Sequence, residues 1–118
     1  GMGRVRQAQY PSMFKAINWI KSINDNCIFL NAHDYDLDNL AFAKTLQPKN
    51  IKIDQLIKNI IALKEIDRPL STIGEQKQCN PFFNTAQSSI IEAVSQQSLP
   101  YSSELDVFTS LRQWRDTF

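Results

Sequence analysis

Apolar residues recur at steps of three and four along most of the chain, which is the spacing of one face of an α-helix. The strongest pattern predicts a helix from about Lys52 to Asp67, which Pro69 would end. Burying six large aliphatic side chains on one face would contribute roughly 10–15 kcal/mol before chain entropy is subtracted. These six residues are Ile53, Leu56, Ile57, Ile60, Ile61 and Leu63. The pattern therefore predicts that this helix forms the centre of the core.

The same spacing predicts further helices near residues 11–23, 36–47, 84–97 and 102–118. The last of them should begin at Ser102 or Ser103, because Ser103-Glu104-Leu105-Asp106 fits a capping-box pattern. Asn-Gly and Asp-Gly hairpin dipeptides are absent, which argues against an all-β domain. The predicted fold class is therefore all-α, a compact bundle of about five short helices.

Residues 68–84 show no helical periodicity and are predicted to form one long irregular loop. Loops of this length are uncommon inside compact domains and often carry function. Near the end of the segment stand Phe82 and Phe83, which would anchor a protein partner if their rings were exposed, because aromatic residues concentrate interface energy. The alternative is that both rings fold back and close one end of the bundle.

A cluster at residues 33–38 holds the only histidine, His33, together with Asp34, Asp36 and Asp38 at alternate positions. These groups could bind a metal ion or form the centre of an enzyme. The aspartates match the opening of a calcium-binding EF-hand loop, but Asn39 and Thr45 stand where that loop requires glycine and glutamate. Carboxylates in a first helical turn also oppose the helix dipole. The sequence therefore favours a negatively charged helix entrance over a metal site.

Residues 40–66 have the scale of a helix-turn-helix, which offers a nucleic-acid-binding alternative. The polar side of its second helix carries side chains able to reach phosphates and base edges, namely Lys52, Gln55, Lys58 and Asn59. Acidic residues on the same helix and a net charge of only +1 weigh against this alternative. Arg112 and Arg115, near the end of the chain, are expected to lie on a solvated helix face.

Composition limits the class of protein further. A chain of 118 residues suits one helical domain, expected over residues 11–118, after a flexible or tag-derived segment at residues 1–10. Cys27 and Cys79 form no disulfide framework, and no apolar run is long enough to cross a bilayer. The N-terminus also lacks the apolar centre of a signal peptide. These features predict a reducing, cytoplasmic location, with non-classical secretion left open.

The sequence contains no glycine-rich phosphate loop and no motif of a metalloprotease or serine hydrolase. It therefore predicts no cofactor and favours a protein–protein interaction module over an enzyme. The partner would be another protein or the remainder of a larger parent chain, and the oligomeric state stays open. The abundance of Ile, Asn, Lys and Gln is typical of AT-rich bacterial genomes, so a bacterial protein is the expected context, with a host-directed effector as one option.

Overall fold

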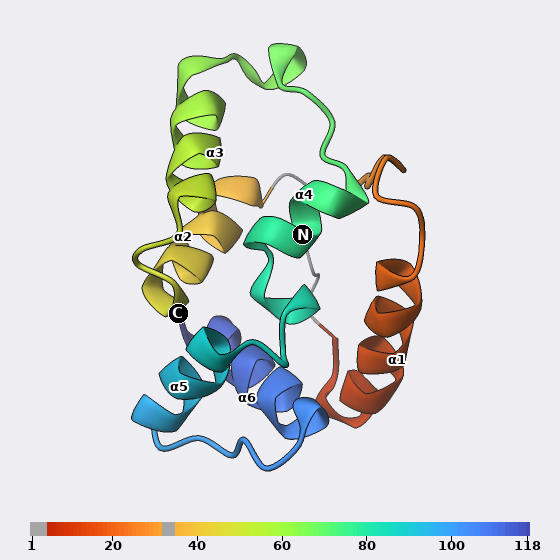
Figure 1. Cartoon of the computed structure of the whole chain (residues 1–118), viewed down its shortest axis with the longest axis vertical. Helices are drawn as coiled ribbons and strands as arrows, with labels where there is room; N and C mark the ends of the chain where they lie inside the picture. Colours follow the sequence, from red (N-terminus) through yellow and green to blue (C-terminus); the bar gives the residue numbers. More distant parts are fainter. Residues whose placement is uncertain (1–4, 32–34) are drawn as a thin grey trace.

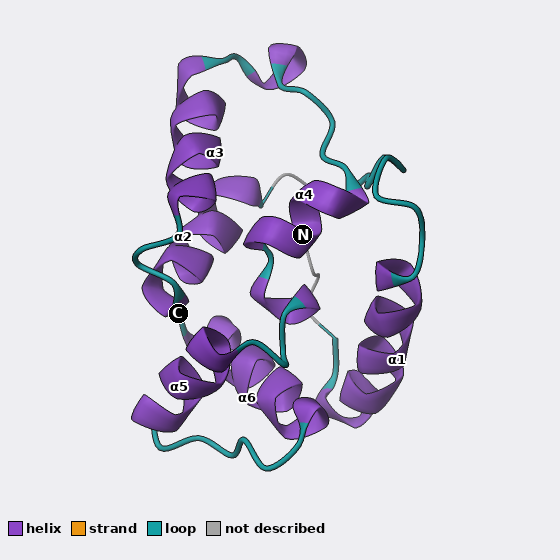
Figure 2. Cartoon of the chain, viewed as in Figure 1, coloured by secondary structure: helices purple, strands orange, loops and turns teal. Residues whose placement is uncertain are grey.

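The computed structural model describes residues 5–31 and 35–118, and helices form the regular structure of this part of the chain (Figure 1). The α-helices are α1 (Tyr10–Lys21), α2 (Asp36–Leu46), α3 (Ile51–Ala62), α4 (Ile73–Cys79), α5 (Ser88–Gln96) and α6 (Glu104–Thr117). Three short 3₁₀ helices are η1 (Gln7–Gln9), η2 (Glu65–Asp67) and η3 (Pro81–Phe83). No strand occurs among the described residues (Figure 2), and the predicted all-α fold class is confirmed.

The main core lies where α1, α5 and α6 meet around η3. Its buried side chains include Ile17 of α1, Phe83 of η3, Ile90 of α5, and Phe108 and Leu111 of α6. Several ring pairs pack edge to face or tilted within this cluster, which suits the aromatic quadrupole. The core therefore brings α1, near the start of the sequence, together with α5 and α6, near its end.

Helix α3 differs from its prediction in both length and burial. It ends at Ala62 and not near Asp67, and only Ile53 among its residues is fully buried. Together with Leu40, Ala43 and Cys79, Ile53 forms a smaller second cluster. The expectation that α3 is the centre of the core was therefore wrong, since periodicity identifies an apolar face but not the elements that cover it.

The segment predicted as a long loop contains helix α4 as well as η3. Thr72 caps α4, and its hydroxyl accepts a hydrogen bond from the Glu75 N–H at 3.2 Å. Gly74 lets α4 approach the chain at Asp25, because a Cβ at this position would lie 3.1 Å from the Asp25 Cβ. Gly74 N–H also donates to the Asp25 carbonyl at 2.9 Å. The glycine that weakens the helical pattern is thus what positions the helix.

The predicted boundaries of the other helices agree more closely with the structure. Helices α1 and α2 begin and end within about two residues of their predicted limits, and Ser103 caps α6 by accepting from the Asp106 N–H at 3.1 Å. Helix α5 begins four residues later than expected, because Asn84 donates its side-chain amide to the Lys77 carbonyl at 2.8 Å. Asn84 therefore ties η3 to α4 and does not cap α5.

Candidate functional site

The structure buries Phe82 and Phe83, the pair proposed as an exposed partner anchor. The Phe82 ring stacks on Phe42 at a centroid distance of 6.3 Å and meets Phe108 edge to face at 5.7 Å. The Phe83 ring meets Phe29 edge to face at 6.0 Å. Both rings belong to the core, so the expectation that they form a surface anchor was wrong. Their hydrophobic area is more favourable inside a bundle of this size than in water.

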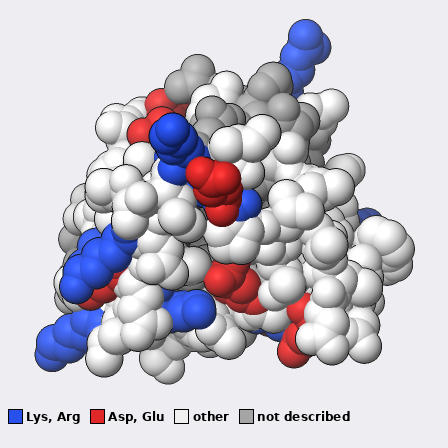
Figure 3. Space-filling view, turned by 90° about the horizontal axis from the view of Figure 1, so that it is seen from above, with Lys and Arg blue, Asp and Glu red and all other residues white. Residues whose placement is uncertain are grey.

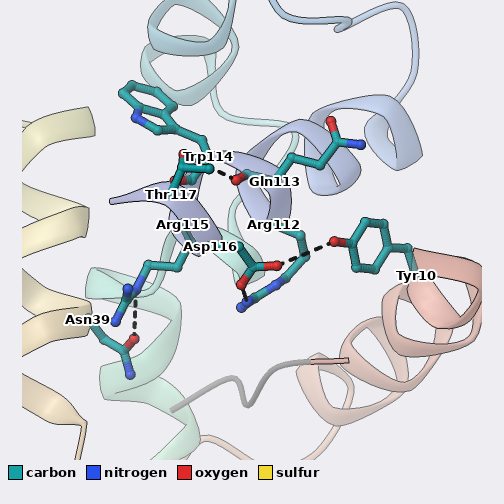
Figure 4. A network of polar contacts seen from close by, with 8 residues as sticks. All are labelled: Tyr10, Asn39, Arg112, Gln113, Trp114, Arg115, Asp116 and Thr117. Carbon is teal, nitrogen blue, oxygen red and sulfur yellow. Dashed lines mark hydrogen bonds and ion pairs between the residues drawn. The ribbon is translucent and has the colours of Figure 1, made fainter. Parts of the chain in front are cut away.

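Arg112 is buried as well, with only 2% of its surface exposed, although the sequence predicts a solvated position. Its guanidinium carbon lies 5.1 Å from the centroid of the Phe82 ring, and its Nη2 contacts Asp116 Oδ1 at 2.5 Å. Tyr10 reaches the other oxygen of Asp116 from α1, at 3.5 Å (Figure 4). The network joins the last turns of α6 to α1 and η3.

Sequence reasoning missed Arg112 because arginine was assigned to solvent by its charge. A signal was nevertheless present: Arg112 follows Phe108 by four residues and Leu111 by one, which places it within the apolar stripe of α6. Asp116, a further four residues along, supplies the opposite charge on the same side of the helix. An arginine within an apolar stripe, followed four residues later by an acidic residue, indicates a buried ion pair within the helix.

Arg115 extends the same helix end toward α2. Its Nε donates to Asn39 Oδ1 at 3.3 Å, and the side chain is half-buried (Figure 4). Asn39 also lines a cavity of about 140 Å³ between α2, α3, α4 and η3. Arg115 therefore contacts a residue of the cavity lining, although it does not line the cavity itself.

The cavity combines an apolar interior with polar and charged groups. Its apolar lining includes Leu40, Leu56, Ile60, Pro81 and Phe82. Its polar lining includes the cations Lys52 and Arg68, the amides Asn39, Asn59, Gln76 and Asn80, and the carboxylates Asp36 and Glu75. Lys52 Nζ lies 3.8 Å from Glu75 Oε1, so this cation is balanced within the lining. An apolar interior with a few polar groups is typical of a small-molecule site.

Two of the four residues proposed for nucleic-acid binding, Lys52 and Asn59, thus line the cavity, whereas Gln55 and Lys58 are exposed. On the face seen in Figure 3, Lys and Arg side chains lie beside Asp and Glu side chains and form no continuous basic stripe. This face lacks the electrostatic footprint that duplex binding requires.

The proposed metal cluster is only partly described. His33 and Asp34 lie outside the described residues, while Asp36 and Asp38 stand in the first turn of α2. Asn31 donates its side-chain amide to Asp36 Oδ1 at 3.4 Å. Within residues 5–31 and 35–118, no three His, Cys, Asp or Glu residues are grouped as a metal site would require. A metal site that includes His33 was the less favoured alternative, and the described residues do not test it.

Cys79 lies on the cavity wall and is buried, whereas Cys27 is exposed. Burial raises the pKa of the Cys79 thiol from 9.0 to about 12, and the Glu75 carboxylate adds to this effect. The thiol donates a hydrogen bond to the Glu75 carbonyl at 3.1 Å. Because the folded pKa is the higher one, the stability due to this group is present below pH 9.0 and is lost as the pH rises toward 12.

We expect one thiol per folded chain to react rapidly with an aromatic disulfide reagent at about pH 8, since the thiolate is the reactive form. Two thiols should react once the chain is unfolded in urea. Cys27→Ser should abolish the rapid phase and Cys79→Ser should leave it intact. Rapid labelling of the folded Cys27→Ser variant would contradict the burial of Cys79.

Among the helices that the structure describes, none is long and apolar enough to span a bilayer.

Comparisons with known proteins bear on the whole of this chain. A family model described as hydroxyacylglutathione hydrolase C-terminus matches residues 34–118. The hydroxyacylglutathione hydrolases of Shewanella pealeana and Psychromonas ingrahamii are each 32% identical to the full chain, and that of Vibrio cholerae is 31% identical. The matched regions are 46%, 47% and 47% of these relatives, so the chain spans about half the length of the curated relatives that it matches.

These matches overturn the interpretation of the chain as an uncharacterised interaction module or host-directed effector. They also overturn the nucleic-acid alternative, because the relatives are named hydroxyacylglutathione hydrolases. The matched family model covers the cavity and the end of α6. The chain belongs to the hydroxyacylglutathione hydrolase C-terminus family.

Proposed function

We propose that the chain is the C-terminal helical part of a hydroxyacylglutathione hydrolase and that it binds the glutathione half of the substrate. The observation that carries this proposal is the family match over residues 34–118, supported by relatives similar over the whole chain. About half of each relative's length lies outside the matched region. The proposal therefore assigns binding to this chain and leaves the reacting groups to the complete protein.

The named reaction sets what the binding site must do. Hydrolysis of a hydroxyacylglutathione adds water across the thioester: the C–S bond breaks, a hydroxy acid forms, and the sulfur leaves as the glutathione thiol. Glutathione is a tripeptide with two carboxylates and two amide links. A binding site for it needs cations for the carboxylates and amide partners for the backbone, held at fixed positions so that the thioester is oriented.

The residues around the cavity fit these needs. Arg68 lines it together with Lys52, which is partly balanced by Glu75, and Arg115 contacts the lining residue Asn39. A guanidinium pairs with a carboxylate through two parallel hydrogen bonds, which adds orientation to attraction. The hydrogen bond from Arg115 Nε to Asn39 limits the rotation of the side chain, so less entropy is lost when a carboxylate binds.

We expect a stable thioether, S-methylglutathione, to shift the NMR signals of Asn39, Lys52, Arg68 and Arg115 saturably, at millimolar affinity or better. The neutral control, N-acetyl-S-methylcysteine amide, should leave them unchanged because it lacks both carboxylates. Arg115→Gln should weaken binding about tenfold, since a charge-assisted hydrogen bond contributes ~1.5–3 kcal/mol.

Lys49→Gln provides a matched control, because Lys49 is an exposed cation that does not line the cavity. It should bind the thioether as the wild-type chain does. Absence of saturable shifts at ~10 mM ligand, or an equal loss of affinity in Lys49→Gln and Arg115→Gln, would contradict the proposed binding site.

A further inference from the structure

The last turn of α3 and the segment that joins it to α4 project from the molecule and carry exposed aliphatic side chains. Ile66 of η2 is 90% exposed, Ile61 69%, Leu70 59% and Leu63 40%. In Figure 1 this segment forms the upper end of the molecule, along its 40 Å long axis. We name these four residues, within ten consecutive positions, the apolar arm.

Single exposed aliphatic residues are normal, but four within one projecting segment are not. The arm is also short of internal support: its described backbone hydrogen bond, from Asp67 N–H to the Lys64 carbonyl, closes a single turn. Helix α3 continues into it with an apolar stripe of which only Ile53 is fully buried. Hydrophobic surface of this kind is stabilised when another element covers it.

The size of the arm indicates which occupant covers it. Four partly exposed aliphatic side chains offer a few hundred Å², below the roughly 800 Å² per partner of a stable interface between separate chains. A segment of the same polypeptide needs less area, because a tether replaces the entropy cost of association with a high effective concentration. More than half of each relative's length lies outside the region matched here, which supplies such a segment.

We propose that the apolar arm docks against the part of the parent hydrolase that lies outside this chain. Ile66 and Leu70 are the anchors, since they expose the most surface within η2 and the segment after it. The arm would thereby hold the wall of the cavity in place, because Arg68, Pro69 and Ser71 line the cavity in the same stretch. The inference rests on family membership and length and does not require the glutathione-binding proposal.

The test compares Ile66→Asp/Leu70→Asp in two proteins: this chain of 118 residues, and the polypeptide of its relatives' length that contains it. In this chain the double variant should shift the melting temperature by less than ~1 °C, because both side chains already face water. In the longer polypeptide it should lower the melting temperature by at least ~4 °C, since two carboxylates would be buried unpaired. Hydroxyl-radical labelling of Ile66 and Leu70 should also fall several-fold in the longer wild-type polypeptide.

Ile51→Asp is the matched control, because Ile51 is 70% exposed at the other end of α3. It should change the melting temperature of either protein by less than ~1 °C, because aspartate is favourable in a first helical turn. Equal melting shifts or equal labelling in the two proteins would overturn the proposal. Sedimentation would also overturn the proposal if this chain formed a dimer and the double variant were monomeric. The arm would then be covered by a second copy of the chain. None of these readouts uses catalysis or glutathione.

Discussion

Replacing Arg112 with alanine is expected to lower the free energy of unfolding by about 3 kcal/mol. The substitution removes a buried guanidinium from the face of Phe82 and leaves Asp116 without the cation that it contacts in α6. Breaking a buried ion pair from one side costs ~3–5 kcal/mol, and the lower end applies because the Asp116 side chain is 30% exposed. For a domain of this size, such a loss is a large part of the total stability.

Urea unfolding followed by circular dichroism measures this loss. Lys49→Ala is the control, since it removes an exposed cation and should change stability by less than ~0.5 kcal/mol. The free energy of unfolding of Arg112→Lys should lie between those of Arg112→Ala and Lys49→Ala, because lysine keeps the charge but loses the planar stacking on Phe82. If Arg112→Ala unfolds at the same urea concentration as Lys49→Ala, Arg112 is solvated and the described network is wrong.

Phe83→Ala is expected to have an effect of similar size, about 3–5 kcal/mol of destabilisation. The Phe83 ring is fully buried and packs against Phe29, so its removal leaves a cavity between η3 and the segment before α2. Many chains should be unfolded at room temperature, with a loss of helical signal and of cooperative melting.

Ile66→Ala removes a comparable aliphatic surface at an exposed position of this chain, and its stability should change by less than ~0.5 kcal/mol. Comparison of Phe83→Ala with Ile66→Ala separates the effect of burial on stability from the effect of hydrophobicity. A stable, cooperatively melting Phe83→Ala variant would show that the ring lies on the surface, as the interaction hypothesis required.

Most of the helices, but not all, could be predicted from the sequence alone. Helices α1, α2 and α6 were predicted because each has a clear apolar stripe and recognisable ends, such as Ser103 before α6. Helix α4 escaped prediction because seven residues, with a glycine at the second position, contain too few turns for a periodic signal. Its cap, Thr72, was present in the sequence but had no apolar stripe after it.

Burial was harder to predict than helix position. The stripe of α3 contains more large aliphatic residues than that of α6, yet α6 lies in the main core and α3 only in the smaller second cluster. Periodicity describes one element at a time, whereas burial depends on which distant elements pack against it. For the same reason Arg112 was placed in solvent: nothing local shows that Phe82 and Tyr10 lie beside it.

The candidate site could be anticipated only in part. Lys52 and Asn59 were singled out for their chemistry and do line the cavity, although they were considered for nucleic-acid binding. Asn39 and Arg68 line the cavity from separate segments, and Arg115 contacts Asn39 from a third, which no local pattern reveals. The chain spans about half the length of the curated relatives that it matches, and its sequence contains no motif of a metalloprotease or serine hydrolase.

Thioester hydrolysis by the polypeptide of its relatives' length, with and without Arg115→Gln, tests the assignment most directly. The wild-type polypeptide should hydrolyse a hydroxyacylglutathione and release one equivalent of glutathione thiol. Arg115→Gln should raise KM about tenfold with kcat nearly unchanged, because a group that only binds the glutathione half stabilises ground state and transition state alike. Absence of thioester hydrolysis in the wild-type polypeptide, or a fall in kcat at constant KM in the variant, would contradict the account.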